Sequence, residues 1–191
     1  MRVIAGLAKG RRLISPKTNA IRPVLDQVKE AVFNILFNVE ALRVLDLFAG
    51  TGAVGIEALS RGAKECVFVD SGKEAIGLIR KNLELCKMDD KGFVLEMPAG
   101  KAINYLAKKN KIFDLIFVDP PYEKNFVKKT LKELAKSSLL HSETLIIVER
   151  HPKEMIGDVE GLSLTDERKY GQTLISFLKQ SFLKQDFLEP Q

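Results

Sequence analysis

Cysteine and histidine are scarce in this sequence of 191 residues, which contains only Cys66, Cys86, His141 and His151. Neither pair has a spacing typical of a metal site, and one pair of cysteines is a poor disulfide framework, so we expect buried, reduced thiols and no metal. No hydrophobic run approaches the length, about 18 residues, that spans a bilayer. The N-terminus also lacks the hydrophobic region of a signal peptide. We therefore expect a cytoplasmic protein with no membrane partner.

Glycine and proline occur at ordinary levels, and 46% of the residues are hydrophobic. This composition excludes collagen-like, low-complexity and disordered chains. A chain of this length is expected to fold as one main domain with a well-formed core.

The positive charge is unevenly distributed along the chain. The formal net charge is +5, and residues 1–30 carry all of this excess, with seven basic residues against two acidic ones. A basic segment attached to a neutral body favours a polyanion such as nucleic acid, although a merely solvated basic terminus is an equally good interpretation. The basic residues that we expect to hold RNA phosphates are Arg11, Arg12, Arg22 and Lys29.

Strands alternate with helices along most of the chain, which predicts a doubly wound, mainly parallel α/β sheet. A short hairpin over 2–14 and a helix starting at Asp26, with Lys29 in solvent, precede this part. The expected strands span 44–48, 66–70, 93–95, 113–118, 145–148, 162–168 and 174–178, and the expected helices span 54–61, 73–87, 101–108 and 126–135. The last two strands form an antiparallel hairpin.

A glycine-rich turn follows the first of these strands. Residues 50–55 match the pattern G-x-G-x-x-G, which permits close approach of a ligand to the backbone but is weak evidence alone. A dinucleotide pyrophosphate and S-adenosylmethionine are competing ligands, and a purely structural turn is the third interpretation. Asp46 would oppose a phosphate, whereas it suits the cationic S-adenosylmethionine. Asp70, at the end of the next strand, suits the ribose hydroxyls of either ligand.

The second motif is Asp119-Pro120-Pro121-Tyr122, after the fourth strand. Two prolines make a rigid turn that fixes the Asp119 carboxylate and the neighbouring carbonyl groups. These acceptors suit an exocyclic amino group, whose nitrogen becomes more nucleophilic when its protons are held, and Tyr122 offers a face for stacking a base. A tight loop with a packing tyrosine is the alternative.

Both motifs resemble those of class I S-adenosylmethionine-dependent amino methyltransferases. The flanking sequences narrow this resemblance to the bacterial 16S ribosomal RNA guanine-N2 methyltransferase family. The matching segments are 2–6, 9–11, 22–26, 29–36 and 55–62. The resemblance implies a seven-stranded Rossmann-like sheet in residues 41–180 and a basic RNA-contacting extension in 1–40. Residues 181–191 lie outside the resemblance, and we expect them to form a loose tail.

The resemblance also implies methyl transfer to the N2 amine of one guanine in 16S rRNA or in a small-subunit particle. The implied catalytic residues are Asp119, Pro120, Pro121 and Tyr122. The implied S-adenosylmethionine contacts are Asp46, Phe48, Ala49, Gly50, Thr51, Gly52, Asp70, Ser71, Lys101 and Ala102. Lys101 stands where the family usually has an acidic or amide residue, so the adenine contact falls to the backbone around Gly100 to Ala102 or to another part of the chain. A methyltransferase for DNA adenine or protein glutamine, and a non-catalytic RNA-binding protein, are the alternatives.

Overall fold

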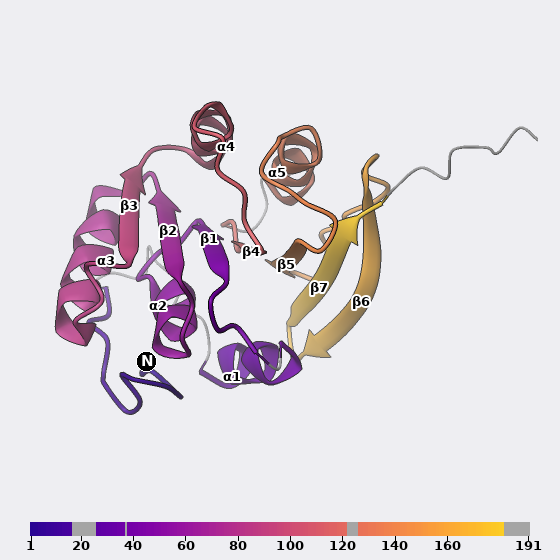
Figure 1. The fold of residues 1–191 in the computed structure, drawn as a ribbon. Coiled ribbons are helices and arrows are strands. Elements are labelled where there is room, and N and C mark those ends of the chain that lie inside the picture. Colours follow the sequence, from indigo (N-terminus) through magenta and orange to yellow (C-terminus); the bar gives the residue numbers. More distant parts are fainter. Residues whose placement is uncertain (17–25, 37, 122–125, 182–191) are drawn as a thin grey trace, which may run out of the picture.

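The computed structural model describes residues 1–16, 26–36, 38–121 and 126–181 (Figure 1). Its elements are α1 (Asp26–Ile35), β1 (Arg43–Leu47), α2 (Ala53–Ser60), β2 (Glu65–Asp70), α3 (Lys73–Cys86), β3 (Gly92–Glu96), α4 (Ala99–Lys108), β4 (Leu115–Val118), α5 (Phe126–Ala135), β5 (Leu145–Arg150), β6 (Leu162–Tyr170) and β7 (Thr173–Gln180). From β1 onward every predicted strand and helix is present, with boundaries within about two residues of those expected.

The seven strands form one sheet in the order β3-β2-β1-β4-β5-β7-β6. Strands β1 to β5 run parallel, and β7 runs antiparallel to both β5 and β6. The strand order reverses between β1 and β4. In open sheets of this kind ligands bind at the carboxyl ends of the strands beside such a switch point. The predicted doubly wound fold is therefore confirmed, and its switch point lies between the strands that carry the two motifs.

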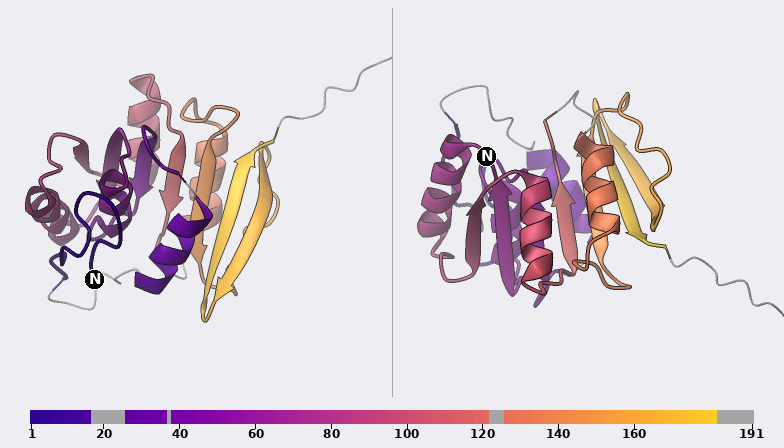
Figure 2. Two further views of the ribbon diagram at one scale, coloured as in Figure 1. Left: turned by 60° about the horizontal axis from the view of Figure 1, so that its bottom comes forward. Right: turned by 90° about the horizontal axis from the view of Figure 1, so that it is seen from above.

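Helices cover both faces of the sheet (Figure 2). The N-terminal segment, α1, α2 and α3 pack on one face, and α4 and α5 pack on the other. Alternation along each strand feeds both cores: in β1, Val44 belongs to the first core, whereas Leu45 and Leu47 belong to the second. Val3, Leu13 and residues of α1 lie in the first core, so the described parts of residues 1–40 share a core with the body.

The N-terminal segment forms less of a hairpin than predicted. An isolated antiparallel bridge pairs Arg2 with Arg12, and the N–H groups of Val3, Gly10 and Leu13 donate across the hairpin to the carbonyl groups of Arg11, Val3 and Met1 at 3.0, 2.8 and 3.2 Å. The backbone N–H groups of Ile4 and Ala5 instead donate to the Glu57 carboxylate of α2, at 2.8 and 3.0 Å. Because a buried side chain takes these donors, the segment is fastened to α2 rather than extended into two strands.

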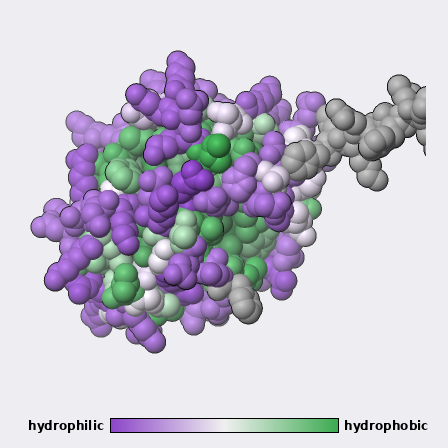
Figure 3. Space-filling view, in the orientation of Figure 1, coloured by the Kyte–Doolittle hydropathy of each residue, from purple (hydrophilic) through white to green (hydrophobic). Residues whose placement is uncertain are grey.

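The remaining surface and core features follow the composition. Cys66 and Cys86 are both buried and unbridged, as predicted. Within the described ranges, no helix has the length and apolar character needed to cross a membrane. Hydrophilic side chains dominate the face shown in Figure 3, and hydrophobic ones occupy smaller areas between them.

Candidate active site

The turn after β1 has the backbone shape that its glycines predict. Gly50 and Gly52 have φ angles of 56° and 77°, in the left-handed region that favours glycine. Gly52 is the N-cap of α2, and a Cβ added there would lie 3.3 Å from the Ile79 side chain. The Ala49 N–H donates to the Val69 carbonyl at 2.9 Å, which holds the turn against β2. The turn therefore allows a ligand to approach its backbone closely at the carboxyl edge of the sheet.

Asp46 lies beneath this turn and is only 3% exposed. Its Oδ2 accepts the Gly55 N–H of α2 at 3.0 Å. The pKa of Asp46 is raised to about 7, chiefly by burial; the Gly55 bond lowers it, and the charge of Asp70 contributes to the rise. A cation placed beside Asp46 would favour the ionised carboxylate, which fits the predicted role of this residue toward a cationic ligand.

Asp70 links two loops through hydrogen bonds. The sequence analysis did not predict this role. Its Oδ2 accepts the Gly50 N–H at 2.9 Å and its Oδ1 accepts the Gly72 N–H at 2.8 Å. Each carboxylate oxygen has a further lone pair, so these bonds leave acceptor capacity for ribose hydroxyls. Asp70 thus fixes the glycine turn relative to the end of β2.

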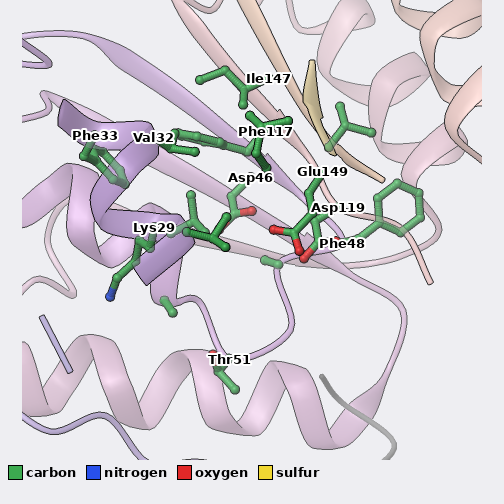
Figure 4. Close-up of a pocket in the computed structure, with 16 residues that line it drawn as sticks. Lys29, Val32, Phe33, Asp46, Phe48, Thr51, Phe117, Asp119, Ile147 and Glu149 are labelled. Carbon is green, nitrogen blue, oxygen red and sulfur yellow. The ribbon is translucent and has the colours of Figure 1, made fainter. Parts of the chain in front are cut away.

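Two pockets lie along the carboxyl edge of the sheet. The first is on the α1 side and is drawn in Figure 4; its lining includes Asp46, Phe48, Ala49, Thr51, Asp119 and Glu149. The second includes Phe48, Asp70, Ser71, Met97, Pro98, Ala99, Gly100, Pro121 and Phe126. Phe48 lines both pockets, and the turn after β4 contributes Asp119 to one and Pro121 to the other. The two pockets therefore meet at the second sequence motif.

Three carboxyl groups face the first pocket. Figure 4 shows Asp46, Asp119 and Glu149, from the ends of β1, β4 and β5, directed toward the same space. The Asp119 N–H is bonded to the Leu47 carbonyl at 3.5 Å, which ties this turn to β1. Pro120 is buried and Pro121 is exposed. Tyr122 lies outside the described residues, so its predicted stacking role stays a prediction.

Comparison with known proteins agrees with this geometry. The family described as "Conserved hypothetical protein 95" matches residues 1–179. The chain belongs to this family. A Bacillus subtilis relative named "Putative rRNA methyltransferase YlbH" is 37% identical, with 94% of this chain and 98% of the relative covered. "Ribosomal RNA small subunit methyltransferase D" of Escherichia coli is 33% identical, with 90% and 86% covered.

A solved structure places the fold in the same group. The structure titled "Putative methyltransferase yhhF from Escherichia coli" has a TM-score of 0.81 and 31% identity, with 94% of this chain and 97% of that chain covered. The sheet is thus the class I methyltransferase sheet, and the family resemblance carried by the motifs is confirmed.

Glu149 is the acidic residue of the first pocket that the sequence analysis missed. The expected strand ended at residue 148, before Glu149. The structure pairs Val118 with Val148 in the parallel ladder of β4 and β5, so Asp119 and Glu149 follow at adjacent positions. Side chains two residues apart on a strand lie on the same face of the sheet. Continuing the expected strand from Ile147 to Glu149 would therefore have placed Glu149 on the same face as Asp119.

The prediction that Lys29 lies in solvent and holds RNA is wrong. Its side chain is 1% exposed, and its Nζ donates to the Arg2 carbonyl at 2.7 Å and lies 3.4 Å from Glu57 Oε2. Arg61 also binds Glu57, at 2.8 Å. A helix residue that looked like part of a basic surface therefore balances a buried carboxylate, because α1 packs directly over α2 and the N-terminal segment.

The structure describes two of the three other predicted RNA contacts. Arg11 and Arg12 are exposed, and Arg11 also donates to the Leu85 carbonyl at the end of α3. Arg22 lies outside the described residues. Exposure leaves both described arginines accessible to phosphates, and their role in RNA binding stays a prediction.

The predicted cofactor contact at Ala102 is also wrong. Ala102 lies on the buried face of α4 and is fully buried, and its N–H donates to the Pro98 carbonyl at 3.0 Å. Lys101 is exposed on α4 and is not among the residues that line the second pocket. Helix α4 begins at Ala99, two residues earlier than expected, so the pocket is lined by residues 97–100 instead.

Proposed function

We propose that this chain transfers a methyl group from S-adenosylmethionine to the exocyclic N2 amine of a guanine in small-subunit rRNA. The supporting observation is the junction of the two pockets at Phe48 and the Asp119–Pro121 turn. Such a junction brings a cofactor in one pocket within reach of a base in the other. The names of the E. coli and B. subtilis relatives point to rRNA as the substrate.

The cofactor proposal depends on three features of the described residues. The turn at Gly50 and Gly52 exposes its backbone, and the second pocket offers Asp70 and Ser71 to hydroxyl groups. Asp46 is a buried carboxyl group whose ionised form a cation would stabilise. A pyrophosphate would instead meet the Asp46 charge. When bound, S-adenosylmethionine supplies an electrophilic methyl group on its sulfonium.

The protein's part in the reaction is to hold the amine. Asp119 and the Pro120 carbonyl accept the two N2 protons of guanine, which draws the nitrogen toward the tetrahedral geometry of a nucleophile. The prolines keep these acceptors fixed, so positioning and electrostatics supply most of the acceleration. The base must leave its stack to enter the pocket, at a cost of a few kcal/mol, and Tyr122 stacks on it there.

The substrate is tested by product identity. The protein is incubated with labelled S-adenosylmethionine and, separately, small-subunit rRNA, small-subunit particles, DNA or protein, and each product is digested for mass spectrometry. N2-methylguanosine from rRNA or particles, lost in Asp119→Ala, is the expected result. Methyladenine in DNA or methylglutamine in protein would establish the alternative substrates. RNA binding without any transfer would establish a non-catalytic protein.

The cofactor is tested separately by calorimetry. We expect S-adenosylmethionine to bind and NADH not to bind. The opposite result would assign the glycine turn to a dinucleotide.

A further inference from the structure

Glu149 and Asp119 occupy equivalent positions on neighbouring strands. The last ladder pair of β4 and β5 is Val118 with Val148, and the next residue on each strand is an acid. Parallel strands lie about 4.8 Å apart, so the two side chains leave the sheet close together and on the same face. Figure 4 shows both carboxyl groups directed into the first pocket.

The backbone at Glu149 is held by β7 and by the contacts of the next residue, Arg150. Glu149 pairs with Ile175 in the antiparallel ladder of β5 and β7. The next residue, Arg150, is buried, and its guanidinium donates to Ser176 Oγ at 3.1 Å and to Glu167 Oε1 at 2.6 Å. These bonds fix the end of β5, and with it the direction in which Glu149 leaves the strand.

The pocket in front of these carboxyl groups has apolar walls. Helix α1 supplies Val28, Val32 and Phe33, and the strands supply Phe117, Ile147 and Ile175. Apolar walls suit the faces of a purine, and acids at the strand ends suit an edge that carries N–H donors. The polar and apolar parts of the pocket therefore match a base that enters with a donor edge toward β4 and β5.

We infer that Glu149 accepts the N1–H of the target guanine while Asp119 accepts an N2–H, and that Glu149 thereby selects guanine. This inference rests on the proposed function. Guanine carries donors at N1 and N2 side by side. Adenine and cytosine carry a bare ring nitrogen beside their amine, and its lone pair would face the Glu149 carboxylate. Glu149 is thus a specificity-determining residue, in addition to the acceptors that activate the amine.

The test changes N1 of the base from a hydrogen-bond donor to an acceptor and keeps the N2 amine. Two small-subunit rRNAs are compared, one with the natural target guanine, located by product mapping, and one with 2,6-diaminopurine there. Diaminopurine has the N2 amine but a bare N1. We expect wild type to prefer guanine by about 10- to 100-fold in kcat/KM, the size of one good base-edge contact. Glu149→Gln should cut this preference at least tenfold, because its amide donates to a bare N1.

Three further measurements make the test specific to base selection. Glu149→Ala should bring the preference toward one without improving diaminopurine. Glu143→Gln, an exposed acid before β5 whose partner is Lys179, should keep the wild-type preference. Affinity for S-adenosylmethionine should be unchanged in all variants. A ratio of two substrates does not depend on the folded fraction, so a partly unfolded variant still reports on selection.

The outcomes separate this inference from the proposed function. If wild type forms N2-methylguanosine but Glu149→Gln keeps the full preference for guanine, selection by Glu149 is wrong and the proposed function stands. If wild type forms no N2-methylguanosine on rRNA or its particles, the proposed function and this inference are both overturned.

Discussion

The two pockets at the sheet edge each contain an aspartate from the end of a strand, but the two aspartates differ in their surroundings. Asp46 in the first pocket is 3% exposed, and the single backbone donor from Gly55 does not compensate for its burial. Asp70 in the second pocket is partly exposed and accepts two backbone N–H groups. The pKa of Asp46 is about 7, so this carboxyl changes its charge near neutral pH. Asp70 instead accepts hydrogen bonds that link two loops.

This difference assigns separate tasks to the two pockets. The first, with Asp119 and Glu149 beside Asp46, suits the chemical step, whereas the second suits cofactor binding through Asp70 and residues 97–100. Variants of Asp119 in the first pocket and of Asp70 in the second should therefore affect different kinetic constants, whereas Asp46, between the turn and the first pocket, should act on cofactor affinity.

The largest expected effect is that of Asp119→Ala. Removing one preorganised acceptor should lower kcat by about 10²- to 10³-fold. The dissociation constant of S-adenosylmethionine should change much less, because the proposed partner of Asp119 is the base. Single-turnover kinetics and calorimetry measure the two quantities. Near-normal turnover in this variant would reduce the Asp119–Pro121 turn to a structural loop and remove the distinction between the pockets.

Asp70→Ala should have the opposite pattern. The loss of a charged acceptor should weaken binding of S-adenosylmethionine by about 1.5–3 kcal/mol, while kcat at saturating cofactor stays close to wild type. Calorimetry with Asp90→Ala, an exposed acid in the α3–β3 turn, provides the matched control. A large loss of kcat together with normal affinity would place Asp70 with the chemical step instead.

Asp46 should make cofactor affinity depend on pH. Its pKa rises from 3.8 to about 7 on folding, so the free protein loses stability as pH rises through that interval, where the folded state keeps the proton. A cation requires the ionised form. Affinity should therefore increase by up to about tenfold per pH unit below about pH 7 and level off above it. Calorimetry across this range checks the dependence, which Asp46→Asn should abolish; a persistent inflection in that variant would assign it to another group.

The smallest expected effect lies outside both pockets. Neutralising Arg11 and Arg12 should lower the salt dependence of RNA binding by roughly 0.7–0.9 per lost phosphate contact, with cofactor affinity unchanged. Filter binding at several salt concentrations measures this slope. Replacing Lys108 and Lys109 by alanine, at the end of α4 on the opposite face of the sheet, provides the control. An unchanged slope in the arginine variant would favour a merely solvated terminus.

Hydrophobic patterning was sufficient to predict most of the fold. Alternating strands and helices predicted the parallel sheet, since a buried parallel strand and an amphipathic helix each have a local signature. The glycine turn at 50–52 and the motif at 119–121 were located for the same reason, because backbone conformation there depends on glycine and proline themselves. The N-terminal hairpin is shorter than predicted, since the backbone donors of Ile4 and Ala5 bond to Glu57, which is distant in sequence, while those of Val3, Gly10 and Leu13 bond across the hairpin.

The sequence by itself determined the succession of strands and helices, the turns and the acids at the ends of β1, β2 and β4, because these follow from neighbouring residues. Only the tertiary structure decided the roles of side chains whose partners come from elsewhere in the chain. Lys29 is buried because Glu57 lies under it, and Ala102 is in the core because α4 starts at Ala99. Glu149 enters the pocket because β5 extends past Val148 in register with β4. The partners of these side chains come from distant parts of the chain, so a local pattern does not specify which residues they meet.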